Sequence, residues 1–169
     1  MNRLLICFSV LVFSLGLNAC DSDGGDVRLA ELPGPGEFQA DYRTSDAFFT
    51  AMEDPEPGAS PHGEVQIWYS QNIRELILSG ETFDNVPVGT VAIKEGASEN
   101  SVVDTVTVMI KREAGYDPDN NNWEYEKRGA DAQLLKNPEG EPIKGTVPGC
   151  IGCHVAASRY DFLGGTFLR

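Results

Sequence analysis

The feature that most constrains this chain is the short sequence Cys-Ile-Gly-Cys-His at residues 150–154, close to its C-terminal end. Two thiols three residues apart and an adjacent imidazole belong to one turn of chain, so the fold must bring Cys150, Cys153 and His154 to one site. These residue types at this spacing can hold a zinc ion, form a redox-active disulfide or tether a haem. The rest of the sequence has to decide between the three.

The N-terminus predicts an export signal rather than part of the fold. An apolar run from Leu4 to Leu17 is too short for a stable membrane span, and it ends in Leu-Asn-Ala-Cys. This ending resembles a bacterial lipobox, in which the cysteine is lipidated after cleavage. We therefore expect residues 1–19 to be a lipoprotein signal peptide, with Cys20 lipid-anchored to a bacterial membrane and facing the periplasm. A plain secretory signal is the alternative.

Residues 20–36 begin with a polar, Gly-rich stretch and predict a flexible tether, which leaves residues 37–169 as the folded domain. Because Cys7 leaves with the signal and Cys20 takes lipid, only Cys150 and Cys153 remain in the mature chain. The two thiols must therefore be explained together.

Zinc and disulfide chemistry fit these thiols less well than haem does. A structural zinc ion needs four protein ligands, and His62 is the one histidine outside the motif. A thioredoxin-like disulfide needs a βαβ setting, whereas the sequence before the motif reads as antiparallel strands. In a c-type haem, Cys150 and Cys153 would add to the two vinyl groups and His154 would be the axial ligand of the iron.

Periodicity predicts an α+β domain, mainly antiparallel sheet with a few short helices. Alternating apolar residues predict strands over residues 63–70, 89–96, 102–112 and 123–129. The polar loop at 117–122 predicts that the last two form a hairpin. Short helices are expected at 44–53, at 72–80 ending at Gly80, and from Cys150 to about Ser158 as a C-terminal haem-attachment helix.

Charge excludes one class of partner. The chain has 26 acidic against 13 basic residues, and an acidic surface repels phosphate backbones. We therefore expect no nucleic acid as a partner.

The sequence after the motif bears on the second axial position of an iron. Fifteen residues follow His154, and none of them is Met or His. A sixth ligand would have to come from Met52, Met109 or His62, of which Met109 reads as a core residue and His62 as an exposed loop residue. An open, five-coordinate iron is the expectation.

Three segments together resemble the cytochrome P-460 family, including its cytochrome c′-beta branch. They are VPVGTVAIKE (86–95), VTVMIKREAGYDPDNNNWEYEKRG (106–129) and CIGCHVAASRYDF (150–162). The resemblance runs from about Gly63 to Leu163. It implies a mainly antiparallel β domain that holds one c-type haem and forms a homodimer.

The resemblance also implies two functions that differ at one lysine. In the P-460 enzymes, which oxidise hydroxylamine, a lysine at the position of Lys94 is bonded to the porphyrin; in the c′-beta branch that bond is absent and the haem binds nitric oxide or carbon monoxide. Strand alternation puts Lys94 on the same face as Thr90 and Ala92. A lysine ending a strand in water is the plainer interpretation.

Three functions follow for a lipid-anchored monohaem cytochrome. The first is a hydroxylamine-oxidising enzyme with an electron-transfer partner, and the second is a gas-binding protein with the same Cys150, Cys153 and His154. The third is a six-coordinate electron carrier that uses Met109 or His62. No distal carboxylate that would act as a proton acceptor can be placed from the sequence.

Overall fold

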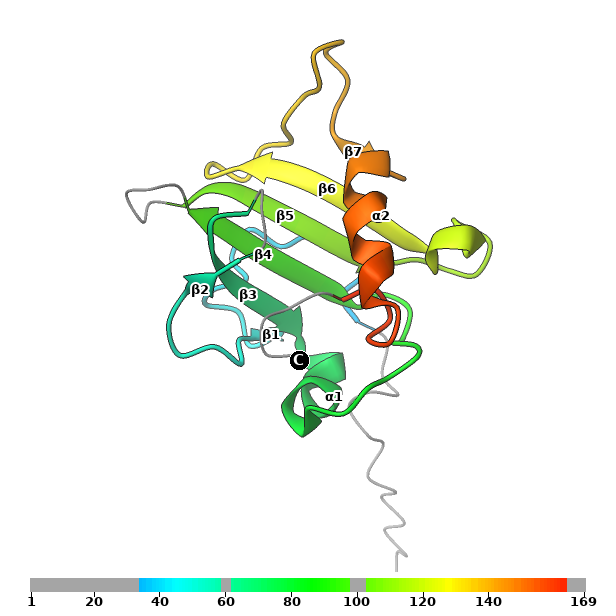
Figure 1. Cartoon of the computed structure of the whole chain (residues 1–169). Helices are drawn as coiled ribbons and strands as arrows, with labels where there is room; N and C mark the ends of the chain where they lie inside the picture. The colour runs from blue at the N-terminus through cyan, green and yellow to red at the C-terminus, as the bar shows by residue number, and fades with distance from the viewer. Residues whose placement is uncertain (1–33, 59–61, 98–102, 164–169) are drawn as a thin grey trace, which may run out of the picture.

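The computed structural model describes residues 34–58, 62–97 and 103–163. In this part of the chain the fold is α+β, as predicted, with one antiparallel sheet and two short helices (Figure 1). The strands are β1 (Phe48–Phe49), β2 (Glu56–Pro57), β3 (Glu64–Ser70), β4 (Val91–Ala97), β5 (Val103–Lys111), β6 (Trp123–Gly129) and β7 (Lys144–Gly145). The helices are α1 (Arg74–Ser79) and α2 (Pro148–His154).

The strands run in the order β1-β3-β4-β5-β6-β7, and β2 adds to β3. All four strands predicted from periodicity are present, and β5 and β6 form the predicted hairpin. Its loop turns through Asn121 and Asn122, whose positive φ angles of 57° and 58° are in the left-handed region that Asn tolerates.

The sheet has a different cover on each of its two faces. On one face Val65, Ile67 and Tyr69 of β3 are buried in a core cluster that includes Ile77 of α1 and packs against Ile151 of α2. The opposite face carries a second cluster, which the segment before β1 covers; its residues are Tyr42, Phe48, Val91, Ile93, Val106, Val108 and Ile110. In Figure 1, α2 crosses in front of β5 and β6 on the first face.

Both helices lie where the sequence predicts helices. Gly80 ends α1 with a φ of 67°, a conformation that a residue without Cβ adopts without strain. Pro148 starts α2, where its missing N–H costs no hydrogen bond, and a 3-10 turn at Val155–Ala157 continues it. The helix carrying the motif is therefore observed; whether it attaches haem is a separate question.

The predicted helix at 44–53 is wrong. Phe48 and Phe49 form a strand that pairs with Ser70 and Tyr69 of β3, and the two rings are buried in different core clusters. The Ser45 hydroxyl accepts a hydrogen bond from the N–H of Ala47, which makes a local turn instead of capping a helix. Burial of two adjacent aromatic rings on opposite faces of the chain favours a strand over the local helix signal.

Gly34 and Gly36 already hydrogen bond to Val88 and Gly89 before β4, so the fold extends into the end of the predicted tether. The predicted signal peptide and Cys20 lie outside the described residues. No helix in the described ranges has the length and apolar character that crossing a membrane requires.

Candidate haem site

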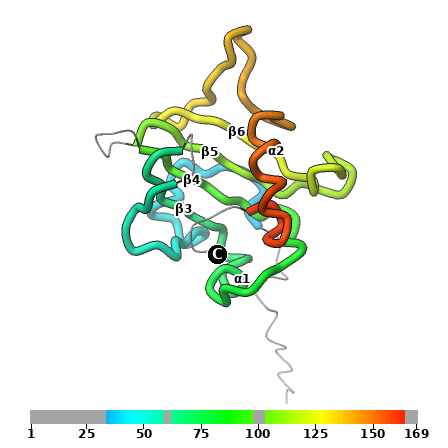
Figure 2. Tube along the Cα trace, in the orientation of Figure 1, coloured from blue at the N-terminus to red at the C-terminus, as the bar shows by residue number. Residues whose placement is uncertain are grey.

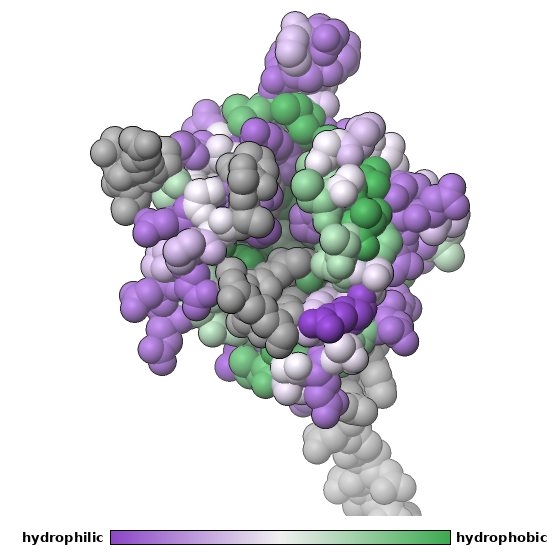
Figure 3. Space-filling model, in the orientation of Figure 1, coloured by the Kyte–Doolittle hydropathy of each residue, from purple (hydrophilic) through white to green (hydrophobic). Residues whose placement is uncertain are grey.

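A cavity of about 500 Å³ lies between the first face of the sheet and α2. Figure 3 shows this face hollowed beside the apolar residues of α2. Its volume is within the range of small-molecule and cofactor sites. Cys150, Cys153 and His154 all line it, so the structure brings the three motif residues to one site as the sequence predicted.

Two rows of paired residues form the floor of the cavity. Directly opposite residues in antiparallel strands point to the same face, so each row can be read from the strand register. The first row consists of Tyr69, Ala92, Met109 and Tyr125. The second row consists of Ile67, Lys94, Thr107 and Lys127. Every member of both rows lines the cavity.

The two thiols are unpaired and differ in exposure. Cys150 is half-buried and packs against the core cluster, whereas Cys153 is exposed. Burial raises the pKa of the Cys150 thiol. Since Cys150, Cys153 and His154 are spaced i, i+3 and i+4 on α2, one side of the helix carries all three.

The His154 imidazole is fixed by a hydrogen bond from Nδ1 to the carbonyl oxygen of Phe162, 2.8 Å away. Because a carbonyl only accepts, Nδ1 must carry the proton, which leaves the lone pair on Nε2. Burial lowers the pKa of His154 and so favours the neutral imidazole, although this hydrogen bond opposes the shift. The ring of Tyr125 packs beside the imidazole, with 5.6 Å between the ring centroids.

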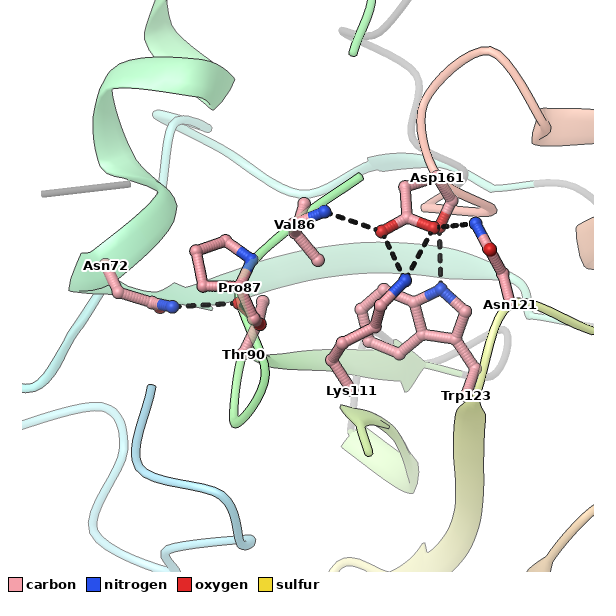
Figure 4. A network of polar contacts seen from close by, with 8 residues as sticks. All are labelled: Asn72, Val86, Pro87, Thr90, Lys111, Asn121, Trp123 and Asp161. Carbon is pink, nitrogen blue, oxygen red and sulfur yellow. Dashed lines mark hydrogen bonds and ion pairs between the residues drawn. The ribbon is translucent and has the colours of Figure 1, made fainter. Parts of the chain in front are cut away.

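The Phe162 carbonyl is held in place by a buried network around Asp161 (Figure 4). Lys111 Nζ lies 2.7 and 2.9 Å from the two carboxylate oxygens of Asp161, and the backbone N–H of Val86 donates to one of them at 2.8 Å. The Asn121 amide donates to the same carboxylate, and the indole N–H of Trp123 donates to the Asp161 carbonyl at 2.7 Å. Asp161 is completely buried.

This network also stabilises an unusual backbone turn. Asp161 and Phe162 have φ angles of 49° and 65°, and two such non-glycine residues in succession cost about 1–3 kcal/mol each. Just before this turn Tyr160 forms an isolated β-bridge with Phe83, so the chain after α2 lies beside the segment between α1 and β4 (Figure 2). The Lys111–Asp161 pair thus fixes the residue that orients His154.

Lys94 lies in the cavity wall rather than at an exposed strand end. It is half-buried, and it faces the same way as Ala92 and opposite to Val91 and Ile93, as strand alternation predicted. Burial lowers the pKa of its amine, which increases the fraction present as a neutral nucleophile.

Two of the three candidate sixth ligands, Met109 and His62, line the cavity, whereas Met52 is buried in the core cluster and is not among the residues that line it. Met109 is buried in the core cluster, as predicted, and lines the cavity from the first row. The expectation that His62 is an exposed loop residue is wrong, because it is half-buried. Burial, assisted by the positive charges of Lys94, His154 and Lys127, lowers the pKa of His62 to about 4.

Several cavity residues were missed by sequence reasoning. Thr107 and Lys127 reach the cavity through the register of β5 and β6, and Asp104 reaches it beside the β-bulge opposite Gly96 and Ala97. Strand alternation fixes which residues share a face within one strand, but it does not say which strands are neighbours. No signal in the sequence could have placed Asp104 at this site.

The residues present fit a haem tethered through thioethers. The thiols and the Nε2 lone pair of His154 come from one helix, and much of the remaining wall is apolar, with Ile67, Val147 and Leu163 among its residues. The buried Tyr125 hydroxyl has no hydrogen-bond partner among the described residues, as expected of a wall group that meets a ligand. No cluster of three or more His, Cys, Asp and Glu side chains that could hold a bare metal ion occurs in the described ranges.

Comparisons with known proteins leave the family open. No protein-family model, curated protein or solved structure matches this chain.

Proposed function

We propose that this protein is an exported, lipid-anchored c-type cytochrome that holds one haem in the cavity beneath α2. Cys150 and Cys153 are the thioether tethers, and His154 is the axial ligand through Nε2. The observation that carries the proposal is the hydrogen bond from His154 Nδ1 to Phe162, since a ligating histidine usually donates its other nitrogen to a fixed acceptor.

The proposed substrates and ligands are small nitrogen compounds such as hydroxylamine and nitric oxide, in keeping with the resemblance to the P-460 family. A haem held by these residues would supply a redox-active iron able to bind such small ligands. The residues of the chain exclude water through Ile67 and Leu163, orient the imidazole through Phe162, and offer Asp104 as a proton acceptor. An electron-transfer partner takes the electrons released when hydroxylamine is oxidised. We propose a homodimer, as the resemblance implies.

The open axial position is tested with the full chain matured by a c-haem assembly system. The ferrous protein should bind carbon monoxide with a large change in its optical spectrum. His154→Ala should keep the tethered haem but change its spin state. Met109→Leu and His62→Gln are matched controls that should leave the spectrum unaltered. If the ferrous protein bound carbon monoxide only after Met109 or His62 had been replaced, the protein would instead be a six-coordinate electron carrier.

Lys94 distinguishes the enzyme from the gas-binding protein. Its desolvated amine in the cavity favours the enzyme, in which Lys94 is bonded to the porphyrin. A strongly red-shifted Soret band that disappears in Lys94→Ala would support the enzyme. An ordinary five-coordinate band, identical in Lys94→Ala, would support a protein that binds nitric oxide without catalysis.

The lipid anchor is tested by fractionating cells. The wild-type protein should sediment with membranes, while Cys20→Ser should release it into the soluble fraction, because no other cysteine lies at the end of the predicted signal. Cys7→Ser is the control and should stay with the membranes. Equal sedimentation of the wild type and Cys20→Ser would contradict anchoring at Cys20.

A further inference from the structure

Two lysines of the cavity differ from the other sheltered cations of this protein. Five described basic residues are buried or half-buried, namely Lys94, Lys111, Arg112, Lys127 and Arg128. Three of them form an ion pair: Lys111 with Asp161 and Arg112 with Glu124, each at 2.7 Å, and Arg128 with Glu126 at 2.8 Å. Lys94 and Lys127 have no ion pair with any described carboxylate, although the chain carries twice as many acidic as basic residues.

The two lysines lie in the same row of the sheet floor. Lys94 on β4 and Lys127 on β6 are both paired with Thr107 of β5, so one strand separates them. At two strand spacings their Cα atoms are roughly 9–10 Å apart. The Thr107 hydroxyl lies between them and donates a hydrogen bond to the backbone carbonyl of Lys94 at 3.4 Å.

The acidic residues nearest this row do not neutralise it. Glu126 lies opposite Val108 of the second cluster, so its side chain is on the other face of the sheet, where Lys144 and Arg128 bind its two carboxylate oxygens, each at 2.8 Å. Asp104 is exposed and pairs with neither lysine. Burial is the main cause of the low pKa of His62, and the positive charges of Lys94, His154 and Lys127 lower it further.

We propose that Lys127 forms a carboxylate-binding site at one end of the cavity, and that Lys94 adds a second cation to it in protein whose Lys94 amine is not bonded to a porphyrin. The ligand chemistry follows from what surrounds it: an apolar body fits against Ile67 and Leu163, and one or two anionic groups fit the separated ammonium groups. This inference rests on the proposed function, in which the carboxylates are the two propionates of the haem. A small free anion that enters beside the haem has the same chemistry and is the other source.

The test compares two porphyrins that differ only in these carboxylates. The full chain with its thiols free is titrated with iron protoporphyrin and with its dimethyl ester, at low salt. The wild type should bind the free acid about tenfold more tightly, which corresponds to about one charge-assisted hydrogen bond. Lys127→Met should lose most of this preference and Lys127→Arg should keep it. Lys136→Met, at an exposed lysine, should behave as the wild type.

A second titration, with nitrite, separates the two sources. One possible result is that the wild type binds both porphyrins equally and also binds nitrite, while Lys127→Met does not bind nitrite. The site would then take a free anion, and the propionates would not be its ligand. Equal affinity for both porphyrins together with unchanged nitrite binding in Lys127→Met would overturn the carboxylate site.

Failure of the proposed function would look different. In that case neither porphyrin would bind to a protein whose circular dichroism shows it to be folded. Nitrite binding, followed by the amide NMR shift of Thr107 in the wild type and in Lys127→Met, would then decide the carboxylate site alone. A Lys127-dependent shift would support it, and its absence would overturn it.

Discussion

One hydrogen bond fixes the tautomer and the orientation of the His154 imidazole. With Nδ1 committed to the carbonyl of Phe162, only Nε2 can bind an iron, and the ring cannot rotate without losing its acceptor. Its neighbour Tyr125 is buried, and burial raises the pKa of the Tyr125 phenol, so this wall group remains a neutral hydroxyl. At the scale of single residues, the site is built for a neutral, fixed imidazole.

His62 gives a prediction about pH in the haem-free protein. Its pKa is about 4 in the fold against 6.5 when unperturbed, so below pH 6.5 the unfolded chain takes up a proton that the folded chain does not. The free energy of unfolding should therefore decrease as the pH falls from about 6.5 to about 4. In His62→Gln, this decrease should be smaller, as measured by urea denaturation at pH 7 and pH 5.

Part of the pH dependence should survive in His62→Gln, because burial lowers the pKa of His154 as well. An exposed-residue variant such as Lys136→Gln serves as the control. If His62→Gln had the same pH dependence as the wild type, His62 would not be sheltered in the cavity as described.

Sequence reasoning at the residue scale succeeded where the spacing is local. Cys150, Cys153 and His154 converge because they belong to one helical turn, and that can be read directly from the sequence. Lys127 could not be assigned to the cavity, because its meeting with Lys94 depends on two strand registers.

At the scale of elements, alternation predicted the strands and the hairpin because each strand buries one or both faces. The helix expected at 44–53 failed because pairing with β3 overrode the local signal at Ser45. The chain after α2 carried no periodic signal at all. Its conformation is determined by Asp161, which joins the end of the chain to β5 through Lys111.

The Lys111–Asp161 pair gives the prediction for this scale. Asp161→Asn leaves the Lys111 ammonium buried without its carboxylate, so the free energy of unfolding should fall by about 3–5 kcal/mol in chemical denaturation. In the haem-loaded protein the same change should alter the optical spectrum, because the Phe162 carbonyl that holds His154 loses its support.

The matched control replaces an exposed carboxylate, as in Glu139→Gln, and should change neither stability nor spectrum. The double variant Lys111→Met with Asp161→Leu should lower the free energy of unfolding by less than the sum of the two single changes, since neither charge is then left unpaired. A cost below about 1 kcal/mol in Asp161→Asn would show that the network does not hold the turn.

At the scale of the whole molecule, the two faces of the sheet differ in what they bury. The face covered by the segment before β1 buries an apolar cluster, while the face beneath α2 combines a core with a cavity. The α+β class was predictable from periodicity, whereas the cavity was not, because it arises from the way α2 and the turn at Asp161 close over the sheet. The central claim is that this cavity holds one covalently bound haem.

The most direct test of that claim is the intact mass of the denatured protein after expression with a c-haem assembly system. We predict a mass increased by one haem, which persists under denaturing conditions because both thioether bonds are covalent. The increase should be absent in the variant with Cys150→Ala and Cys153→Ala. A wild-type mass without haem, in cells that mature a known c-type cytochrome, would contradict the account.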